Sequence, residues 1–198
     1  MLKKDEIKVL KLLFSDLTKN FTIMDLSREL NQKYVQTYRT IMSLVKSNDI
    51  YLESIGNSKV VKVDLTRFNL NYAIAEIERL RDNLKNKTLS LIHKRIIELK
   101  SNFVCLLFGS QVNNHSSKSD FDLLFVIPSE FNLNLFEKKV KNQLIPYNCD
   151  INVVTEKSLL EMWSNPKKLN VGNEILKKHL ILYNAEHFLN LLKKYYVG

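Results

Sequence analysis

The sequence predicts an α+β protein: a front domain of three helices and a β-hairpin, followed by a small α/β domain with a mixed sheet. Two observations lead to this prediction. Over the first 100 residues, apolar residues recur mainly at three- and four-residue spacings, the period of an amphipathic helix. In the second half, short apolar runs typical of buried strands alternate with helical patterns. We place the front domain at 1–67, a linking helix at 68–87 and the back domain at 88–198.

The front domain begins with three predicted helices. The first covers about 7–17 and places apolar residues such as Leu10 and Phe14 on one face. Thr22 belongs to a residue type that favours helix N-termini, so we expect it to cap a short second helix that ends near Leu30. A third helix should run from about 33 to 46. The short connection between the second and third helices is the spacing of a helix-turn-helix.

Two β-rich runs follow the third helix. Residues 50–55 and 59–63 flank the polar turn Gly56-Asn57-Ser58, and this arrangement predicts a β-hairpin. Three helices followed by a hairpin are typical of a winged helix. The front domain is therefore predicted to be a winged helix-turn-helix domain.

Basic residues are concentrated in the front half. Residues 1–100 carry 19 Lys and Arg against 12 Asp and Glu, a net charge of +7, whereas residues 101–198 have a net charge of +2. Positive charge favours polyanions, and the chain has no acidic residue from Gln32 to Lys46. We therefore expect contact with DNA or RNA through Lys33, Gln36, Thr37, Arg39 and Lys59. A role in packing or dimerisation alone stays open for this domain.

The linking helix and the back domain continue the pattern. Apolar spacing predicts helices at 70–84 and 89–100, with a break near 83–87. The remaining predicted elements are strand 103–108, a Gly-Ser turn, strand 121–127, helix 131–143, strand 149–154, helices 156–163 and 173–180, a short run at 181–183 and helix 185–196. The back domain should therefore be a sheet covered by helices.

Polar residues interrupt the apolar strands of the back domain at three places. Gly109-Ser110 closes one predicted strand, Asp120 and Asp122 open the next, and Asp150 lies within a third. Because residues i and i+2 of a strand point to the same face, Asp120 and Asp122 should present two carboxylates side by side. A glycine lets the backbone approach a phosphate closely, and the Ser110 hydroxyl can bind its oxygens. An Asp inside an apolar strand costs free energy unless it is paired or binds a metal.

This arrangement resembles the DNA polymerase beta-like nucleotidyltransferase superfamily, and within it the small prokaryotic minimal nucleotidyltransferases. The family motif is Gly-Ser, a spacer, Asp-x-Asp and a later Asp on a strand; here it reads Gly109-Ser110, Asp120-Phe121-Asp122 and Asp150. The stretch from Asn173 to Tyr183 is also similar, so the resemblance covers about residues 88–198. Many relatives carry an Arg and a second Gly soon after Gly-Ser, where this chain has Gln111-Val112-Asn113-Asn114-His115.

The resemblance implies a Mg²⁺-dependent nucleotidyltransferase. Such an enzyme moves an NMP from an NTP, with ATP the expected donor, to a hydroxyl group and releases pyrophosphate. Asp120, Asp122 and Asp150 would be the catalytic residues and the ligands of two Mg²⁺ ions, and Asp150 would help to activate the acceptor hydroxyl. The residues implied in binding the triphosphate are Gly109, Ser110 and Lys118, with His115 a further candidate in the same polar loop.

Two classes of function follow from these patterns. One is an active transferase whose winged helix directs it to nucleic acid or to a partner protein, with the acceptor open between a protein, an RNA 3′ end and a small molecule. The other is a DNA-binding transcriptional regulator that retains an inactive transferase fold. The three Asp residues favour the enzyme, and the missing Arg favours the regulator. A homodimer stays open in both classes.

Composition limits the setting in which the protein acts. No apolar run approaches the roughly 20 residues of a membrane span, so we expect a soluble protein without a membrane partner. The N-terminus has a charged amphipathic pattern rather than a secretory signal, which favours the cytoplasm. Cys105 and Cys149 fall in apolar strand patterns without CxxC spacing, which predicts buried free thiols and neither a disulfide nor a zinc site.

Overall fold

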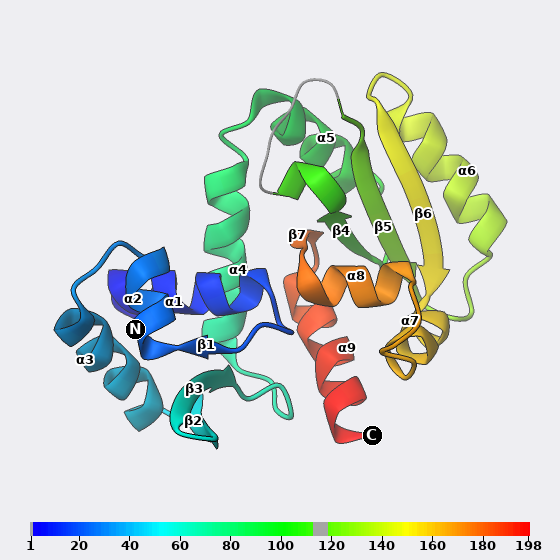
Figure 1. The fold of residues 1–198 in the computed structure, drawn as a ribbon. Coiled ribbons are helices and arrows are strands. Elements are labelled where there is room, and N and C mark those ends of the chain that lie inside the picture. The colour runs from blue at the N-terminus through cyan, green and yellow to red at the C-terminus, as the bar shows by residue number, and fades with distance from the viewer. Residues whose placement is uncertain (1, 113–118) are drawn as a thin grey trace.

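The chain has an α+β fold with two sheets (Figure 1). The computed structural model describes residues 2–112 and 119–198. In these residues, a three-stranded sheet belongs to the front part of the chain and a four-stranded sheet to the back part. Two candidate triphosphate-binding residues, His115 and Lys118, lie outside the described residues.

The three helices predicted for the front part are present: α1 (Lys4–Ser15), α2 (Ile23–Glu29) and α3 (Tyr34–Lys46). The expected cap of α2 is confirmed, because the Thr22 hydroxyl accepts a 3.1 Å hydrogen bond from the Asp25 N–H. The Asp25 carboxylate accepts a 2.9 Å hydrogen bond from the Thr22 N–H in return, which completes a capping box. The start of α2 is therefore set by two local side chains.

The predicted hairpin is also present, and a strand that the sequence did not predict joins it. β2 (Ile50–Ile55) pairs antiparallel with β3 (Ser58–Val63), and the two-residue β1 (Phe21–Thr22) pairs with the other side of β3. The order is thus β1-β3-β2. Gly56 in the hairpin turn has a φ of 58°, a conformation that glycine adopts without steric cost.

α4 (Leu70–Asn83) lies between the two parts (Figure 1). It contacts α1 of the front part as well as β7 (Leu180–Tyr183) and α9 (Ala185–Val197) of the back part. One apolar cluster runs through this region and contains buried residues from both parts, among them Phe14, Tyr72 and Phe188. The two parts therefore share a core.

Arg79 of α4 also joins the two parts. Its buried guanidinium donates a 3.0 Å hydrogen bond to the carbonyl oxygen of Phe14 in α1 and a second one to the carbonyl oxygen of His179, next to β7. The same group forms a 2.6 Å ion pair with buried Glu76. Leaving a buried charge such as that of Arg79 without its partners costs free energy.

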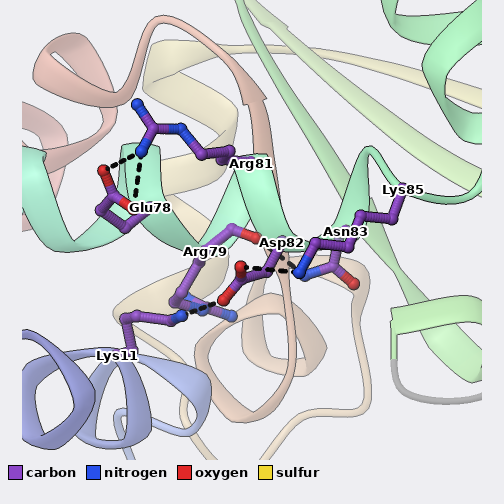
Figure 2. A network of polar contacts seen from close by, with 7 residues as sticks. All are labelled: Lys11, Glu78, Arg79, Arg81, Asp82, Asn83 and Lys85. Atoms are coloured by element: carbon purple, nitrogen blue, oxygen red, sulfur yellow. Dashed lines mark hydrogen bonds and ion pairs between the residues drawn. The ribbon is translucent and has the colours of Figure 1, made fainter.

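More exposed side chains of α4 form weaker ion pairs (Figure 2). Lys11 of α1 contacts Asp82, and Arg81 lies 2.9 Å from Glu78 on an exposed surface. Figure 2 shows Arg81 and Arg79 on opposite sides of the helix, with Arg79 on the side of Lys11. Exposed pairs of this kind contribute about 0–1 kcal/mol each.

The four-stranded sheet of the back part has the order β6-β5-β4-β7. β4 (Val104–Phe108) pairs antiparallel with both β5 (Phe121–Ile127) and β7, while β5 and β6 (Cys149–Thr155) are parallel. The prediction of a mixed sheet is therefore confirmed. Between β4 and β5, the sequence Gly109–Val112 forms a short 3₁₀ helix, η1, where a simple turn was expected.

Helices cover both faces of this sheet. α5 (Lys87–Ile97) and α6 (Leu133–Leu144) pack on the face that Leu123 and Phe125 help to form. α7 (Glu156–Trp163), α8 (Val171–Lys177) and α9 pack on the face that includes Leu124 and Val126. Successive residues of a strand point to opposite faces, so even-numbered residues of β5 lie on the α8 side.

α8 is held against α7 by close packing. Gly172 leaves room for this contact, because a Cβ there would lie 2.7 Å from the Cβ of Met162. The indole of Trp163 donates a 2.8 Å hydrogen bond to the carbonyl oxygen of Gly172, and Trp163 is completely buried. Trp163 is therefore a packing residue. The backbone N–H of Leu17 also donates a 2.9 Å hydrogen bond to the carbonyl oxygen of Leu176, so α8 contacts the front part too.

The two cysteines differ in exposure. Cys105 is buried, as predicted, whereas Cys149 is only half-buried, and both are free thiols. None of the helices in 2–112 and 119–198 has both the length and the apolar character needed to span a bilayer.

Candidate functional site at the acidic end of the four-stranded sheet

The antiparallel pairing of β4 and β5 brings the Gly-Ser turn against the Asp-x-Asp motif. Phe108, the last residue of β4, pairs with Asp122 near the start of β5. Gly109 follows Phe108 directly and therefore lies beside Asp122 although 13 positions separate them in the sequence. Two motifs that are distant along the chain thus meet through sheet register.

Asp150 reaches the same place from the neighbouring strand. In the parallel pair of β5 and β6, Asp122 and Asp150 are register partners. Strand alternation places both on the α8 side of the sheet, because Val126 and Val154 at equivalent positions pack in the apolar cluster of that side. Asp120 immediately precedes β5, and buried Phe121 separates it from Asp122, as the sequence predicts.

Local hydrogen bonds hold the two outer carboxylates. The side-chain amide of Asn148 donates to the Asp120 carboxylate, and that of Asn152 donates to the Asp150 carboxylate at 3.3 Å. Asp120 and Asp150 are exposed, whereas Asp122 is half-buried. The expected desolvation cost of an Asp within an apolar strand therefore falls on Asp122 and not on Asp150, because Asp150 is the second residue of an edge strand.

The electrostatics identify a fourth carboxylate near these three. The pKa of Asp122 is raised above its ordinary value of 3.8, mainly by partial burial and then by the negative charges of Asp150, Asp120 and Glu174. Glu174 is an exposed residue of α8, which packs against β4. We call these four residues, Asp120, Asp122, Asp150 and Glu174, the acidic end. None of them takes part in an ion pair within the part of the chain that the structure describes.

Glu174 was not among the site residues predicted from the sequence. It follows a helix-capping Asn170 and a buried Asn173, and this local pattern indicates only the start of a helix. Its place near Asp122 depends on how α8 packs on the sheet, which is a long-range property of the fold. No signal in the sequence around Glu174 carries that information.

Gly109 has both conformational and steric reasons to be glycine. Its φ is 71°, in the left-handed region that other residues seldom adopt. A Cβ at this position would overlap Oδ2 of Asp122 and lie 3.0 Å from its Cγ. The Asp122 carboxylate therefore rests directly against the backbone of the Gly-Ser turn.

Ser110 and Gln111 contact Ser119 across the start and end of the loop between η1 and β5. The Ser110 hydroxyl is exposed and lies 3.4 Å from the Ser119 hydroxyl. The buried amide of Gln111 donates 2.6 Å hydrogen bonds to the carbonyl and the hydroxyl oxygen of Ser119. Gln111, which departs from the family motif, thus has a structural role at the base of this loop.

The donors at the acidic end suit Mg²⁺ in their chemistry. Mg²⁺ prefers oxygen ligands and is usually held by one or two carboxylates together with substrate phosphates. Within the described ranges, no group of three or more Asp, Glu, His or Cys side chains is placed so that it could hold a metal ion without further ligands. Partial burial and then repulsion by the neighbouring carboxylates raise the pKa of Asp122, and a bound divalent cation would offset that repulsion. The residues therefore fit an ion that is shared with a phosphate ligand.

The residues predicted to bind nucleic acid do not all reach one surface. Lys33, Arg39 and Lys59 are exposed, the first two on or next to α3 and the third in the hairpin. Gln36 is exposed, but its side-chain amide donates a 2.9 Å hydrogen bond to Asp5 of α1. Thr37 is completely buried, which contradicts its predicted contact with nucleic acid.

The position of Thr37 has a signal in the sequence that the prediction overlooked. Thr37 precedes Ile41 by four residues and Leu44 by seven, and all three form the buried stripe of α3. Its hydroxyl lies 3.4 Å from the carbonyl oxygen of Lys33, which satisfies it inside the protein.

No protein-family model matches this chain, and no curated protein or solved structure matches it either. The site is therefore interpreted from its own geometry.

Proposed function

We propose that the protein is a Mg²⁺-dependent nucleotidyltransferase of the DNA polymerase beta-like type that moves an NMP, with ATP the expected donor, to an acceptor hydroxyl. One observation carries the proposal: Asp120, Asp122 and Asp150 meet at one end of the mixed sheet, with the Gly-Ser turn in contact with Asp122. Neither the motif nor the fold alone would support the proposed nucleotidyl transfer. An acidic pair near a strand end is common, but its contact with a turn that can bind phosphate supports this chemistry.

The residues of the acidic end have different roles in this proposal. Asp120 and Asp122 would hold Mg²⁺ together with the triphosphate, and Asp150 would share a second ion. Bound Mg²⁺ neutralises charge on the triphosphate and lowers the pKa of a bound hydroxyl. Exposed Asp150 accepts the proton of the acceptor hydroxyl as that hydroxyl attacks the α-phosphorus, and pyrophosphate leaves.

The Gly-Ser turn positions the phosphates of the donor. The missing Cβ of Gly109 leaves room for the Asp122 carboxylate beside the turn, and the backbone N–H groups of the turn would bind phosphate oxygens. The exposed hydroxyl of Ser110 is free to exchange its long 3.4 Å contact for a phosphate oxygen. Gln111 keeps this turn in place through its hydrogen bonds to Ser119.

We assign the front part as a winged helix that brings the transferase to nucleic acid or to a partner protein. The order of α1, α2 and α3, followed by the β2–β3 hairpin, supports this assignment. Exposed basic residues on α3 and the hairpin support a polyanionic partner. The shared core with the back part would hold such a partner at a defined distance from the acidic end.

The experiment that tests the proposal follows labelled nucleotide into an acceptor. The protein is incubated with each α-labelled NTP and Mg²⁺ in a cell lysate, and label is measured in protein, RNA and small molecules. Asp122→Asn is compared with Glu130→Gln, which removes an exposed carboxylate beyond the opposite end of β5.

We expect label in one fraction from wild type and from Glu130→Gln, and none from Asp122→Asn. That result would also name the class of acceptor. Equal labelling by wild type and Asp122→Asn would contradict the proposal. No labelling with any NTP, together with tight and salt-sensitive binding of duplex DNA, would instead favour a transcriptional regulator with an inactive transferase fold.

A further inference from the structure

A groove of about 590 Å³ lies in the front part, between α3, the start of α2 and the hairpin. Its walls include the side chains of Met24, Tyr34, Tyr38, Met42, Asn57 and Lys59. We call these six residues the tyrosine groove. The acidic end lies in the other part of the chain, so the groove is a separate site.

Large apolar side chains of the groove are exposed. Tyr34 and Tyr38 are 45% and 44% exposed, and Met24 and Met42 are 45% and 38% exposed. Scattered exposed apolar residues are ordinary, but four of them that line one groove mark a binding surface. Core packing does not account for them, because the buried stripe of α3 is formed by Thr37, Ile41 and Leu44.

The two tyrosine rings lie next to each other at the surface of α3. Tyr34 and Tyr38 are one helical turn apart on α3, their ring centroids are 6.3 Å apart and their planes differ by 28°. The rings are therefore nearly parallel. Exposed aromatic faces of this kind are suited to stacking with flat ligands.

The charge of the groove favours an anionic ligand. No acidic residue lines it, and Lys59 lies at its hairpin wall. Exposed Lys33 directly precedes Tyr34 in the chain, and the first 100 residues carry a net charge of +7. The ligand that this surface complements has flat apolar rings and negative charges in alternation.

We propose that the tyrosine groove binds a single-stranded segment of nucleic acid, with unpaired bases stacked on Tyr34 and Tyr38 and phosphates next to Lys59 and Lys33. This proposal deepens the nucleic-acid contact of the proposed function and rests on it. Proteins that bind single strands combine a basic groove with aromatic side chains on which bases stack. In a duplex the base faces are covered by neighbouring bases, and only the edges are accessible in the grooves. Two tyrosine faces and two thioethers match the faces of bases better than their edges.

The test compares single strands with the duplex of the same sequence. Fluorescence anisotropy measures binding of labelled RNA and DNA strands of about 12 nucleotides, a length within the range of single-strand sites, at about 0.15 M salt. The wild-type protein is compared with Tyr38→Leu, which keeps an apolar side chain but removes the aromatic face. The matched control is Tyr51→Leu, because Tyr51 is 47% exposed and lies on the face of β2 opposite to Leu52, a residue of the groove wall.

We expect a single strand of RNA or DNA to bind at least about tenfold more tightly than its duplex, and Tyr38→Leu to weaken this binding by about tenfold. Tyr51→Leu should bind as wild type does. Circular dichroism of each variant checks that the fold is intact. We expect an intact fold, because the rings of Tyr38 and Tyr51 are both about half exposed.

Three results would overturn the proposal. The first is equal or tighter binding of the duplex, and the second is a lack of binding to any strand. The third is a concentration-dependent dimer that Tyr38→Leu disrupts, since the groove would then belong to a second copy of the chain. Strand binding is measured without nucleotide transfer, so it should persist in Asp122→Asn. Loss of strand binding with transfer intact, or of transfer with strand binding intact, separates this proposal from the proposed function.

Discussion

The acidic end and the tyrosine groove differ in how strongly the fold constrains them. At the acidic end, partial burial and the negative charges of three neighbouring carboxylates raise the pKa of Asp122, and the backbone of Gly109 lies directly against its carboxylate. In the tyrosine groove, the large apolar side chains are exposed, and Lys59 is the basic residue of the lining. The first region holds like charges together against their repulsion, while the second presents apolar rings to water.

This difference indicates two ways in which a small protein prepares for a ligand. Repulsion at the acidic end is relieved by a cation, so the fold stores unfavourable charge where a metal and a triphosphate would bind. The groove instead leaves apolar area uncovered until a ligand covers it. Substitutions at the acidic end should therefore change transfer strongly, and those in the groove should change binding.

Asp122→Asn should produce the largest effect. The substitution keeps the shape of the side chain but removes the charge at the centre of the acidic end, and we expect transfer to fall by about 10³-fold. Glu130→Gln should leave transfer unchanged. Initial rates of label transfer for the two variants measure the difference, and a loss of less than about tenfold in Asp122→Asn would place the chemistry elsewhere.

Arg79→Met should have the largest effect on stability, because Arg79 joins the front and back parts of the chain through buried contacts. It leaves Glu76 buried without its cation and removes the donors to the carbonyl oxygens of Phe14 and His179. Removing one partner of a buried ion pair costs about 3–5 kcal/mol. Urea denaturation should show a loss of this size.

Arg81→Met is the matched control for Arg79→Met. Arg81 is on the same helix and also pairs with a Glu three residues away, but its side chain is 72% exposed. Its loss should cost less than about 1 kcal/mol. Similar costs for Arg79→Met and Arg81→Met would show that the buried contacts of Arg79 do not hold the two parts together.

Gly109 at the acidic end and Gly56 in the hairpin turn both have a positive φ and can be compared. Gly109→Ala introduces both backbone strain at φ 71° and an overlap with the Asp122 carboxylate, whereas Gly56→Ala at φ 58° meets nothing within 4 Å. We expect Gly56→Ala to cost about 1–2 kcal/mol from strain alone. Gly109→Ala should cost more and should also impair transfer, and thermal unfolding together with transfer rates measures both. Equal effects of the two substitutions would contradict the close approach at Gly109.

The elements of the fold were largely predictable, because apolar periodicity is a local signal. The helix capped by Thr22 and the hairpin around Gly56 are set by residues within a few positions of each other. β1 was missed because two residues are too few to show a period, and only its pairing with β3 makes it a strand. Local patterns thus predicted nearly every element longer than one turn.

The site was predictable only in part. The Gly-Ser and Asp-x-Asp motifs could be recognised in the sequence as candidate site residues. Their contact, however, depends on the register of β4 with β5, which no local pattern encodes. Glu174 was missed for the same reason, since its proximity to Asp122 depends on the packing of α8. Thr37 was placed wrongly because polar character was given more weight than its helical spacing from Ile41.

The smallest predicted effect is the pH dependence of stability at Asp122. Its pKa is raised in the folded protein, so the protonated form favours folding below the ordinary value of 3.8, and this contribution is lost as pH rises through the folded pKa. Asn at position 122 has no carboxylate to ionise, so Asp122→Asn does not lose this stability as pH rises. The variant should therefore gain stability relative to wild type between pH 4 and pH 7, as urea denaturation at the two pH values would measure. A relative loss over the same range would mean that Asp122 has a favourable charge partner.

The most direct test of the acidic end does not require the acceptor to be known. Electron paramagnetic resonance can measure Mn²⁺, used in place of Mg²⁺, as it binds in the presence of a non-hydrolysable NTP analogue. We predict that wild type and Glu130→Gln bind Mn²⁺ together with the nucleotide, and that Asp120→Asn and Asp122→Asn do not. Equal binding of Mn²⁺ and nucleotide by wild type and the two Asp variants would contradict the assignment of this end of the sheet as a nucleotidyl transfer site.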